Sequence, residues 1–195
     1  MNEKIREIIK NIRELEDELR TLLYEQQTSF SYKIAGKRIE FEKSIREAHK
    51  KLKTSWFYWF ITINPKHFLS APFIYGLIVP LFIFDVGVSV YQFICFRLYG
   101  IKRVKRSDYF IFDHQHLAYL NIFEKSHCLY CSYATGLINY GREIAARTEE
   151  YWCPIKHAHK IADPHNRYID FFDYGDAESY QNKFEEHRKE AQKEK

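Results

Sequence analysis

The chain has 195 residues, a formal net charge of +4, and a composition in which 17% of residues are aromatic. A chain of this length forms one domain or two small ones and can bury a core. Acids and bases are mixed along most of it, which argues against a dedicated nucleic-acid binder with a strong basic face. Four cysteines are too few for a secreted disulfide framework, and the charged first 20 residues lack the apolar stretch of a signal peptide. We therefore expect a reduced, cytoplasmic environment.

Residues 1–53 predict an amphipathic helix, a short hairpin and a basic helix. The first stretch places apolar residues at alternating spacings of three and four, which is the pattern of a heptad seam: Ile5, Ile8, Ile12, Leu15, Leu19 and Leu22. This helix packs either on its own domain or on a second subunit as a coiled coil, which would make a homo-oligomer. Alternating apolar residues on both sides of Gly36 predict the hairpin. Residues 41–52 then predict a helix with basic residues along one face.

Residues 54–106 predict an aromatic interface followed by a membrane segment. The stretch Trp56–Trp59 carries amphipathic rings of the kind found where a membrane meets water. From Phe68 to Phe96 the only charged residue is Asp85, and an apolar run of that length is typical of a segment inserted in lipid. A carboxylate within such a run is costly, so Asp85 needs a partner or water.

Two topologies fit this segment. Basic residues flank it on both sides, so the positive-inside bias does not choose an orientation. A re-entrant hairpin bent near Pro80 to Gly87 keeps both flanks cytoplasmic, whereas a single straight span places one flank outside. In either case we expect the cytoplasmic face of a bacterial inner membrane, with membrane lipid as the partner and no nucleic acid.

Residues 107–180 predict a helical domain that contains a Cys/His site, followed by a charged tail at 181–195. Cys128 and Cys131 form a C-x-x-C pair, and Cys153 and His157 complete a Cys3His set that suits one structural zinc ion, with iron as the other candidate. If residues 131 to 153 were one straight helix, its ends would lie roughly 33 Å apart. The single site therefore requires a break in the helix near Gly136 to Gly141.

A second arrangement avoids that distance. Antiparallel helices at 114–127 and 136–152, with the C-x-x-C at their turn, would bring together a different set of ligands: His114, His116, Cys153 and His157. Glu124 and His127 form an E-x-x-H motif, but a di-iron bundle needs that motif twice. A reactive dithiol and cysteines that pack as small hydrophobic residues are further alternatives.

Three blocks of the chain resemble a family of bacterial membrane-associated proteins without an established activity. They are "FRLYGIKRVKRSDYF", "CLYCSYATGLINYGREIAARTEEYWCPIKHA" and "DPHNRYIDFFDYGDAESY". That resemblance implies a bacterial, membrane-associated origin and no particular reaction. The chain is expected to be mainly α-helical. Its leading function is a membrane-anchored metal-binding scaffold or interaction module, followed by a membrane-associated metalloenzyme and by a metal-free interaction protein.

Overall fold

The computed structural model describes residues 3–29, 32–35, 38–41, 43–53, 55, 61 and 64–193, and across them the chain is mainly helical. The chain forms two compact units. The first comprises Met1–Thr62 and Asp113–Ser126, and the second comprises Ile63–Phe112 and His127–Lys195. The aromatic stretch Trp56–Trp59, expected at a membrane interface, lies outside the described residues.

The first unit contains the elements expected near the N-terminus. Helix α1 spans Glu3–Ser29, strands β1 (Tyr32–Ala35) and β2 (Arg38–Phe41) pair antiparallel with Tyr32 opposite Phe41, and helix α2 spans Lys43–Lys51. The order helix, hairpin, helix is the one that the sequence predicts, whereas pairing of the α1 seam with another helix stays a prediction. The described seam residues of α1 are each half exposed or more: Ile8, Ile12, Leu15, Leu19 and Leu22.

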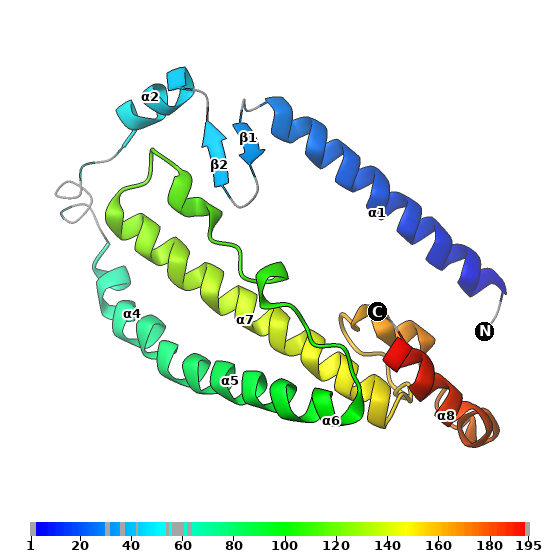
Figure 1. The fold of residues 1–195 in the computed structure, drawn as a ribbon. Coiled ribbons are helices and arrows are strands. Elements are labelled where there is room, and N and C mark those ends of the chain that lie inside the picture. The colour runs from blue at the N-terminus through cyan, green and yellow to red at the C-terminus, as the bar shows by residue number, and fades with distance from the viewer. Residues whose placement is uncertain are drawn as a thin grey trace. The chain divides into compact units, whose positions relative to one another are not determined.

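One long helix begins the second unit (Figure 1). It comprises α4 (Pro65–Gly76), α5 (Ile78–Tyr91), a π-helical turn η1 (Gln92–Phe96) and α6 (Arg97–Tyr99). Asn64 caps its start by accepting a hydrogen bond from the Lys66 amide at 3.0 Å, and Gly100 ends it in the left-handed conformation with φ of 70°.

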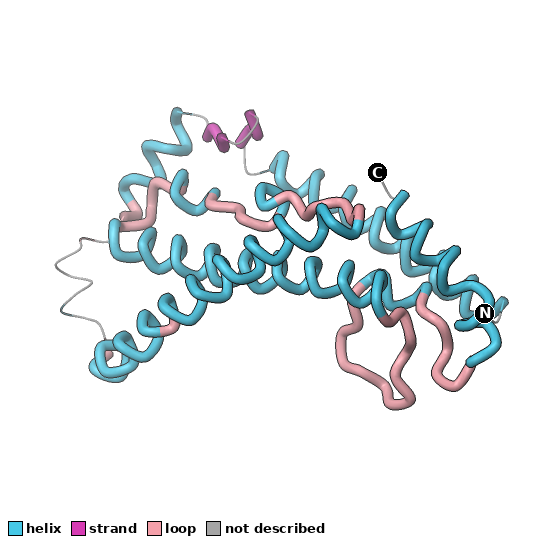
Figure 2. The backbone as a smooth tube through the Cα atoms, turned by 60° about the horizontal axis from the view of Figure 1, so that its bottom comes forward, coloured by secondary structure: helices cyan, strands magenta, loops and turns pink. Residues whose placement is uncertain are grey.

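The bend predicted between Pro80 and Gly87 is absent, so the re-entrant hairpin is wrong. Both residues lie inside α5, and Figure 2 shows this part of the chain running on without folding back. Pro80 falls in the first turn of α5, where an amide hydrogen is not needed for that helix's own hydrogen bonds. The proline is therefore accommodated without reversing the chain.

Helix α7 (Ile122–Trp152) is a single helix of 31 residues that runs parallel to the long apolar helix in the second unit (Figure 1). Near the start of both helices, the Tyr130 hydroxyl donates to the Ile74 carbonyl at 2.6 Å. Near their ends, the rings of Tyr99 and Tyr151 stack with centroids 5.3 Å apart. The two antiparallel helices predicted for 114–127 and 136–152 are therefore wrong, because one helix occupies most of that stretch.

Two parallel helices need a connection that returns along their length. Ile101–Phe112, which we call the return segment, supplies the part of it that lies in the second unit. Apart from the short 3-10 turn η2 (Arg106–Asp108) it is irregular. Its side chains Ile101 and Val104 join Phe96, Leu137, Tyr140 and Ile144 in the buried core.

Two glycines of α7 permit close packing. A Cβ atom at Gly136 would lie 2.7 Å from the Tyr109 carbonyl oxygen of the return segment, and one at Gly141 would lie 2.6 Å from the Phe84 ring of α5. The expected role of these glycines as helix breaks is wrong. They are contact points within a continuous helix.

Three further elements complete the described chain. They are the short helix η3 (Asp113–His116) of the first unit, and η4 (Asn166–Asp170) and helix α8 (Ala177–Lys193) of the second. Helix α8 is tied to the rest of its unit by Arg188, which donates to the Tyr151 carbonyl at 3.2 Å, and by Gln192, which donates to the Tyr99 carbonyl at 2.6 Å.

Candidate functional site

The long helix of the second unit exposes large apolar side chains along its whole length. We call this set the apolar face: Phe68, Leu69, Phe73, Val79, Phe82, Ile83, Val86, Val90, Phe93, Ile94 and Leu98. Each of them is between 48% and 77% exposed. The helix has 35 residues and is therefore about 52 Å long. Among the described residues, it is the one helix long and apolar enough to cross a membrane, judged by length and composition.

The opposite side of the same helix carries polar groups that contact the rest of the unit. Asp85 is 8% exposed, and both of its carboxylate oxygens accept hydrogen bonds from the Arg106 guanidinium, with Nη2 to Oδ2 at 2.7 Å. The Tyr133 hydroxyl donates to the same carboxylate at 2.9 Å, and the Ser89 hydroxyl donates at 3.3 Å. We call Asp85, Ser89, Arg106 and Tyr133 the polar clamp, because it joins α5, the return segment and α7.

A second set of hydrogen bonds extends the polar clamp by two turns. The Gln92 side chain donates to the Tyr140 hydroxyl at 2.7 Å and accepts from the Val104 amide at 2.5 Å. Gln92 is 6% exposed, so both halves of its amide are satisfied inside the unit. The π-helical turn begins at this residue, and it places Gln92 and Phe96 together on the buried side.

The electrostatics of the polar clamp keep its charges in place. Hydrogen bonding to Asp85 raises the pKa of Arg106, so this cation holds its proton even more firmly than usual. The guanidinium also lies over the Phe110 ring, 4.1 Å from its centroid. Burial, and then the hydrogen bond to Asp85, raise the pKa of the Tyr133 phenol. Tyr133 is therefore held in its neutral, hydrogen-donating form.

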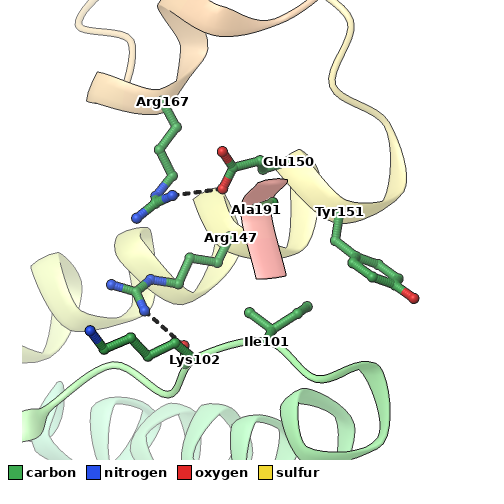
Figure 3. Close-up of a pocket in the computed structure, with 7 residues that line it drawn as sticks. All are labelled: Ile101, Lys102, Arg147, Glu150, Tyr151, Arg167 and Ala191. Carbon is green, nitrogen blue, oxygen red and sulfur yellow. Dashed lines mark hydrogen bonds and ion pairs between the residues drawn. The ribbon is translucent and has the colours of Figure 1, made fainter. Parts of the chain in front are cut away.

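Beyond the end of the apolar helix, the second unit contains a pocket of about 270 Å³ with charged walls (Figure 3). Arg167 donates to Glu150 at 2.7 Å, and Arg147 donates to the Lys102 carbonyl at 2.7 Å. Glu143 accepts from Arg147 at 2.8 Å. The arginines of this pocket are thus already neutralised by carboxylates, and they hold the end of α7 to the return segment and to η4.

No family model, curated protein or solved structure matches this chain. The features of this chain that bear on its function are therefore the apolar face, the polar clamp and the side chains around them.

The predicted Cys3His ligands are distributed along and beyond α7. Cys128 and Cys131 are free thiols on adjacent turns of this helix, and Cys153 is a free thiol just after it. Because α7 is unbroken, about 37 Å of helix separates Cys128 from Cys153. The structure does not bring these thiols together, and the described residues contain no group of three His, Cys, Asp or Glu side chains that could hold a metal ion.

The histidines named for metal binding have other contacts. The His157 ring stacks on Tyr168 with centroids 6.3 Å apart, and His114 lies 3.4 Å from the Asp113 carboxylate. His114 and His116 belong to the first unit, whereas Cys153 and His157 belong to the second. Glu124 completes a reciprocal helix cap, in which it accepts from the Asn121 amide at 2.7 Å while its own amide donates to the Asn121 side chain at 2.9 Å.

Sequence reasoning recognised that Asp85 needs a partner but did not name it. Arg106 stands in the basic cluster after the apolar run, 21 residues from Asp85, and Tyr133 lies 48 residues away. The carboxylate inside an apolar run was the signal. The identity of its partners depends on how the return segment and α7 pack.

Proposed function

We propose that this protein is a membrane-surface scaffold whose long apolar helix lies in the plane of a membrane. In this arrangement the apolar face dips into the lipid, and α7 with the return segment faces water. The observation that carries the proposal is the division of one helix into an exposed side that is almost wholly apolar and a covered side that holds the polar clamp.

A helix of this length and composition can also cross a membrane, but the return segment favours the in-plane orientation. The return segment runs back beside the helix, with the Val104 amide bonded to Gln92 and Arg106 bonded to Asp85. A crossing helix would carry this irregular backbone, with exposed side chains at Lys102, Arg103 and Lys105, to the depth of the hydrocarbon. Irregular backbone exposed to lipid leaves polar groups unsatisfied at several kcal/mol each. An in-plane helix avoids that cost.

The apolar face offers enough surface to hold the unit on a membrane. Burying a large apolar side chain completely contributes about 1.5–3 kcal/mol. The eleven side chains of this face are already partly covered, so roughly 1 kcal/mol each is a reasonable share, or about 10 kcal/mol together. Binding of that strength resists removal by salt or alkali.

We propose that the helix lies on the cytoplasmic face of a bacterial inner membrane, as the sequence predicts. The scaffold role rests on α1, whose apolar seam is exposed and therefore offers a surface for a second helix. That helix would come from a second copy of this chain or from another protein.

Depth measurements test the orientation. Single cysteines at Leu69, Ile83 and Leu98, in a background with the native cysteines replaced by alanine, are labelled with a fluorophore and quenched by lipids that carry a spin label at known depth. All three positions are at least 66% exposed. An in-plane helix gives three equal, shallow depths. A deep Ile83 between two shallow ends would contradict the proposal and support a crossing helix.

Membrane attachment itself is tested by fractionation. We expect the protein to stay with membranes after an alkaline carbonate wash, because attachment depends on the apolar face. A variant with Phe82→Asp, Ile83→Asp and Val86→Asp should be released. Recovery of the wild-type protein in the soluble fraction would refute attachment.

Zinc binding at Cys128, Cys131, Cys153 and His157 remains a separate proposal, supported by four ligands of suitable chemistry. It requires α7 to open near Gly136 to Gly141. Ligation by His114, His116, Cys153 and His157 is the other form of the proposal, and use of either site in catalysis would require an open coordination position.

A further inference from the structure

A groove at the C-terminal end of the apolar helix combines an apolar floor with cationic walls. Its volume is about 480 Å³, and its lining residues are Phe93, Phe96, Arg97, Gly100, Ile101, Lys102, Arg103 and Gln192. Three of these side chains are cations and none is a carboxylate. The groove therefore presents positive charge beside an aromatic surface.

The positive charge of this groove is not neutralised from within the described part of the chain. Arg97, Lys102 and Arg103 are all exposed, and among the described residues none of them has a carboxylate within ion-pair distance. This sets the groove apart from the neighbouring 270 Å³ pocket, where Arg147 and Arg167 are paired with glutamates. An anion that enters the groove meets cations with no internal competitor.

The aromatic floor is continuous with the apolar face. Phe93 is 55% exposed and belongs to both, and the Arg103 guanidinium lies 5.8 Å from the centroid of its ring. Phe96 also borders the groove and is fully buried. A ligand that occupied the groove would thus place its anionic end on the three cations while an apolar chain continued along the face that we assign to lipid.

We propose that this groove binds the headgroup phosphate of an anionic phospholipid, with one acyl chain lying against Phe93. The inference rests on the proposed function, because it assumes that the apolar face meets a membrane. It adds selectivity for lipid charge, since the apolar face alone does not distinguish a neutral bilayer from an anionic one. Basic pockets at the membrane boundary of other proteins recognise phospholipid headgroups through the same chemistry.

Vesicle flotation with the full-length protein tests the inference. One vesicle population is phosphatidylcholine alone, and the other contains 30% phosphatidylglycerol. We expect the wild-type protein to bind both, and to prefer the anionic vesicles. Each basic side chain close to an anionic surface contributes about fivefold to partitioning, so the R97Q/K102Q/R103Q variant should lose up to roughly 100-fold in binding to anionic vesicles. Its binding to phosphatidylcholine should stay within about twofold.

A charge-matched variant separates a specific groove from general attraction. K160Q/K183Q/K189Q removes the same net charge from exposed positions of the same unit that do not line the groove. The K160Q/K183Q/K189Q variant should retain most of the preference for anionic vesicles. The R97K/R103K variant, which keeps the charge of the groove, should retain it too. Equal losses in the two triple variants would overturn the inference, and far-UV circular dichroism confirms that each variant is folded.

Two further results distinguish this inference from its foundation. If the wild-type protein fails to bind phosphatidylcholine but binds anionic vesicles, the apolar face does not enter lipid and the proposed function fails. If it binds both vesicles equally, the proposed function stands and the phospholipid site is refuted. Competition by 10 mM inorganic phosphate, with sodium chloride matching its ionic strength as control, would assign the groove to a free anion instead of a lipid.

Discussion

Within the polar clamp, we expect replacement of Arg106 to destabilise the fold more than replacement of Asp85. The Asp85 side chain is 11% exposed, whereas the Arg106 side chain is 46% exposed. If Arg106 is replaced by glutamine, the carboxylate stays buried and keeps only the Tyr133 and Ser89 hydroxyls as donors. If Asp85 is replaced by asparagine, the guanidinium can turn to water and still lie over Phe110.

The expected magnitudes follow from that difference. Breaking a fully buried ion pair by removing one partner costs about 3–5 kcal/mol, and the half-exposed Arg106 lowers this, so we expect about 2–3 kcal/mol for Arg106→Gln. Asp85→Asn keeps an acceptor for the hydroxyls and should cost about 1–2 kcal/mol. The double variant should cost about as much as Arg106→Gln alone, which corresponds to a coupling energy of about 1.5 kcal/mol.

Guanidinium-induced unfolding in detergent micelles, followed by circular dichroism, measures all four proteins of this cycle. The control is Asp173→Asn, which removes a surface partner of Lys156 at 2.8 Å, where Asp173 is 70% exposed. This change should stay within about 0.5 kcal/mol. Additive single effects, or a larger loss for Asp85→Asn than for Arg106→Gln, would refute the reasoning.

Three other predictions test separate features. Replacing Ile12 and Leu15 of α1 together by aspartate should dissociate any oligomer that forms through the seam, as measured by light scattering, and an unchanged oligomer would exclude the seam as its interface. Zinc content after purification should fall in both Cys128→Ser and Cys153→Ser if one Cys3His site exists, and in Cys153→Ser alone if the histidine-containing alternative exists, whereas equal content in all three proteins would exclude both sites. Burial and the bond to Asp85 raise the pKa of Tyr133, so its contribution to the free energy of unfolding is complete below pH 10 and should be lost as the pH rises through the higher folded-state pKa. The Tyr133→Phe variant should lack this alkaline loss of stability. A stability profile identical to that of the wild type would contradict the prediction.

The parts of the fold that sequence predicted are those set by local patterns. The spacing from Ile8 to Leu22 specifies α1, and the alternation around residues 32–41 specifies the hairpin, since both depend on residues close together in the chain. The apolar run from Phe68 to Phe96 is likewise a local pattern, and it lies within one long helix between Pro65 and Tyr99.

The parts that sequence did not predict depend on contacts between distant segments. Gly136 and Gly141 have low helix propensity and were read as breaks, but the return segment and Phe84 pack against them, and this packing outweighs roughly 1 kcal/mol of propensity at each site. The same distance in sequence hid Arg106 as the partner of Asp85. Because α7 is continuous, no turn within it brings Cys128 and Cys131 close to Cys153 and His157.

If the long helix lies on a membrane as proposed, Asp85 determines which side of it faces lipid. A helix that is apolar on every side has no preferred rotation about its axis, because any side can meet lipid at similar cost. Asp85, Ser89 and Gln92 follow one another at spacings of four and three, so they lie on one side. Arg106 of the return segment donates to Asp85 and to the Ser89 hydroxyl, and Gln92 bonds to Val104 of the return segment and Tyr140 of α7. Rolling the helix by one residue, about 100°, would break these bonds and turn the Asp85 carboxylate toward lipid at a cost of several kcal/mol. In the proposed arrangement the apolar side chains supply the affinity for lipid, and the polar residues among them determine which side of the helix meets it.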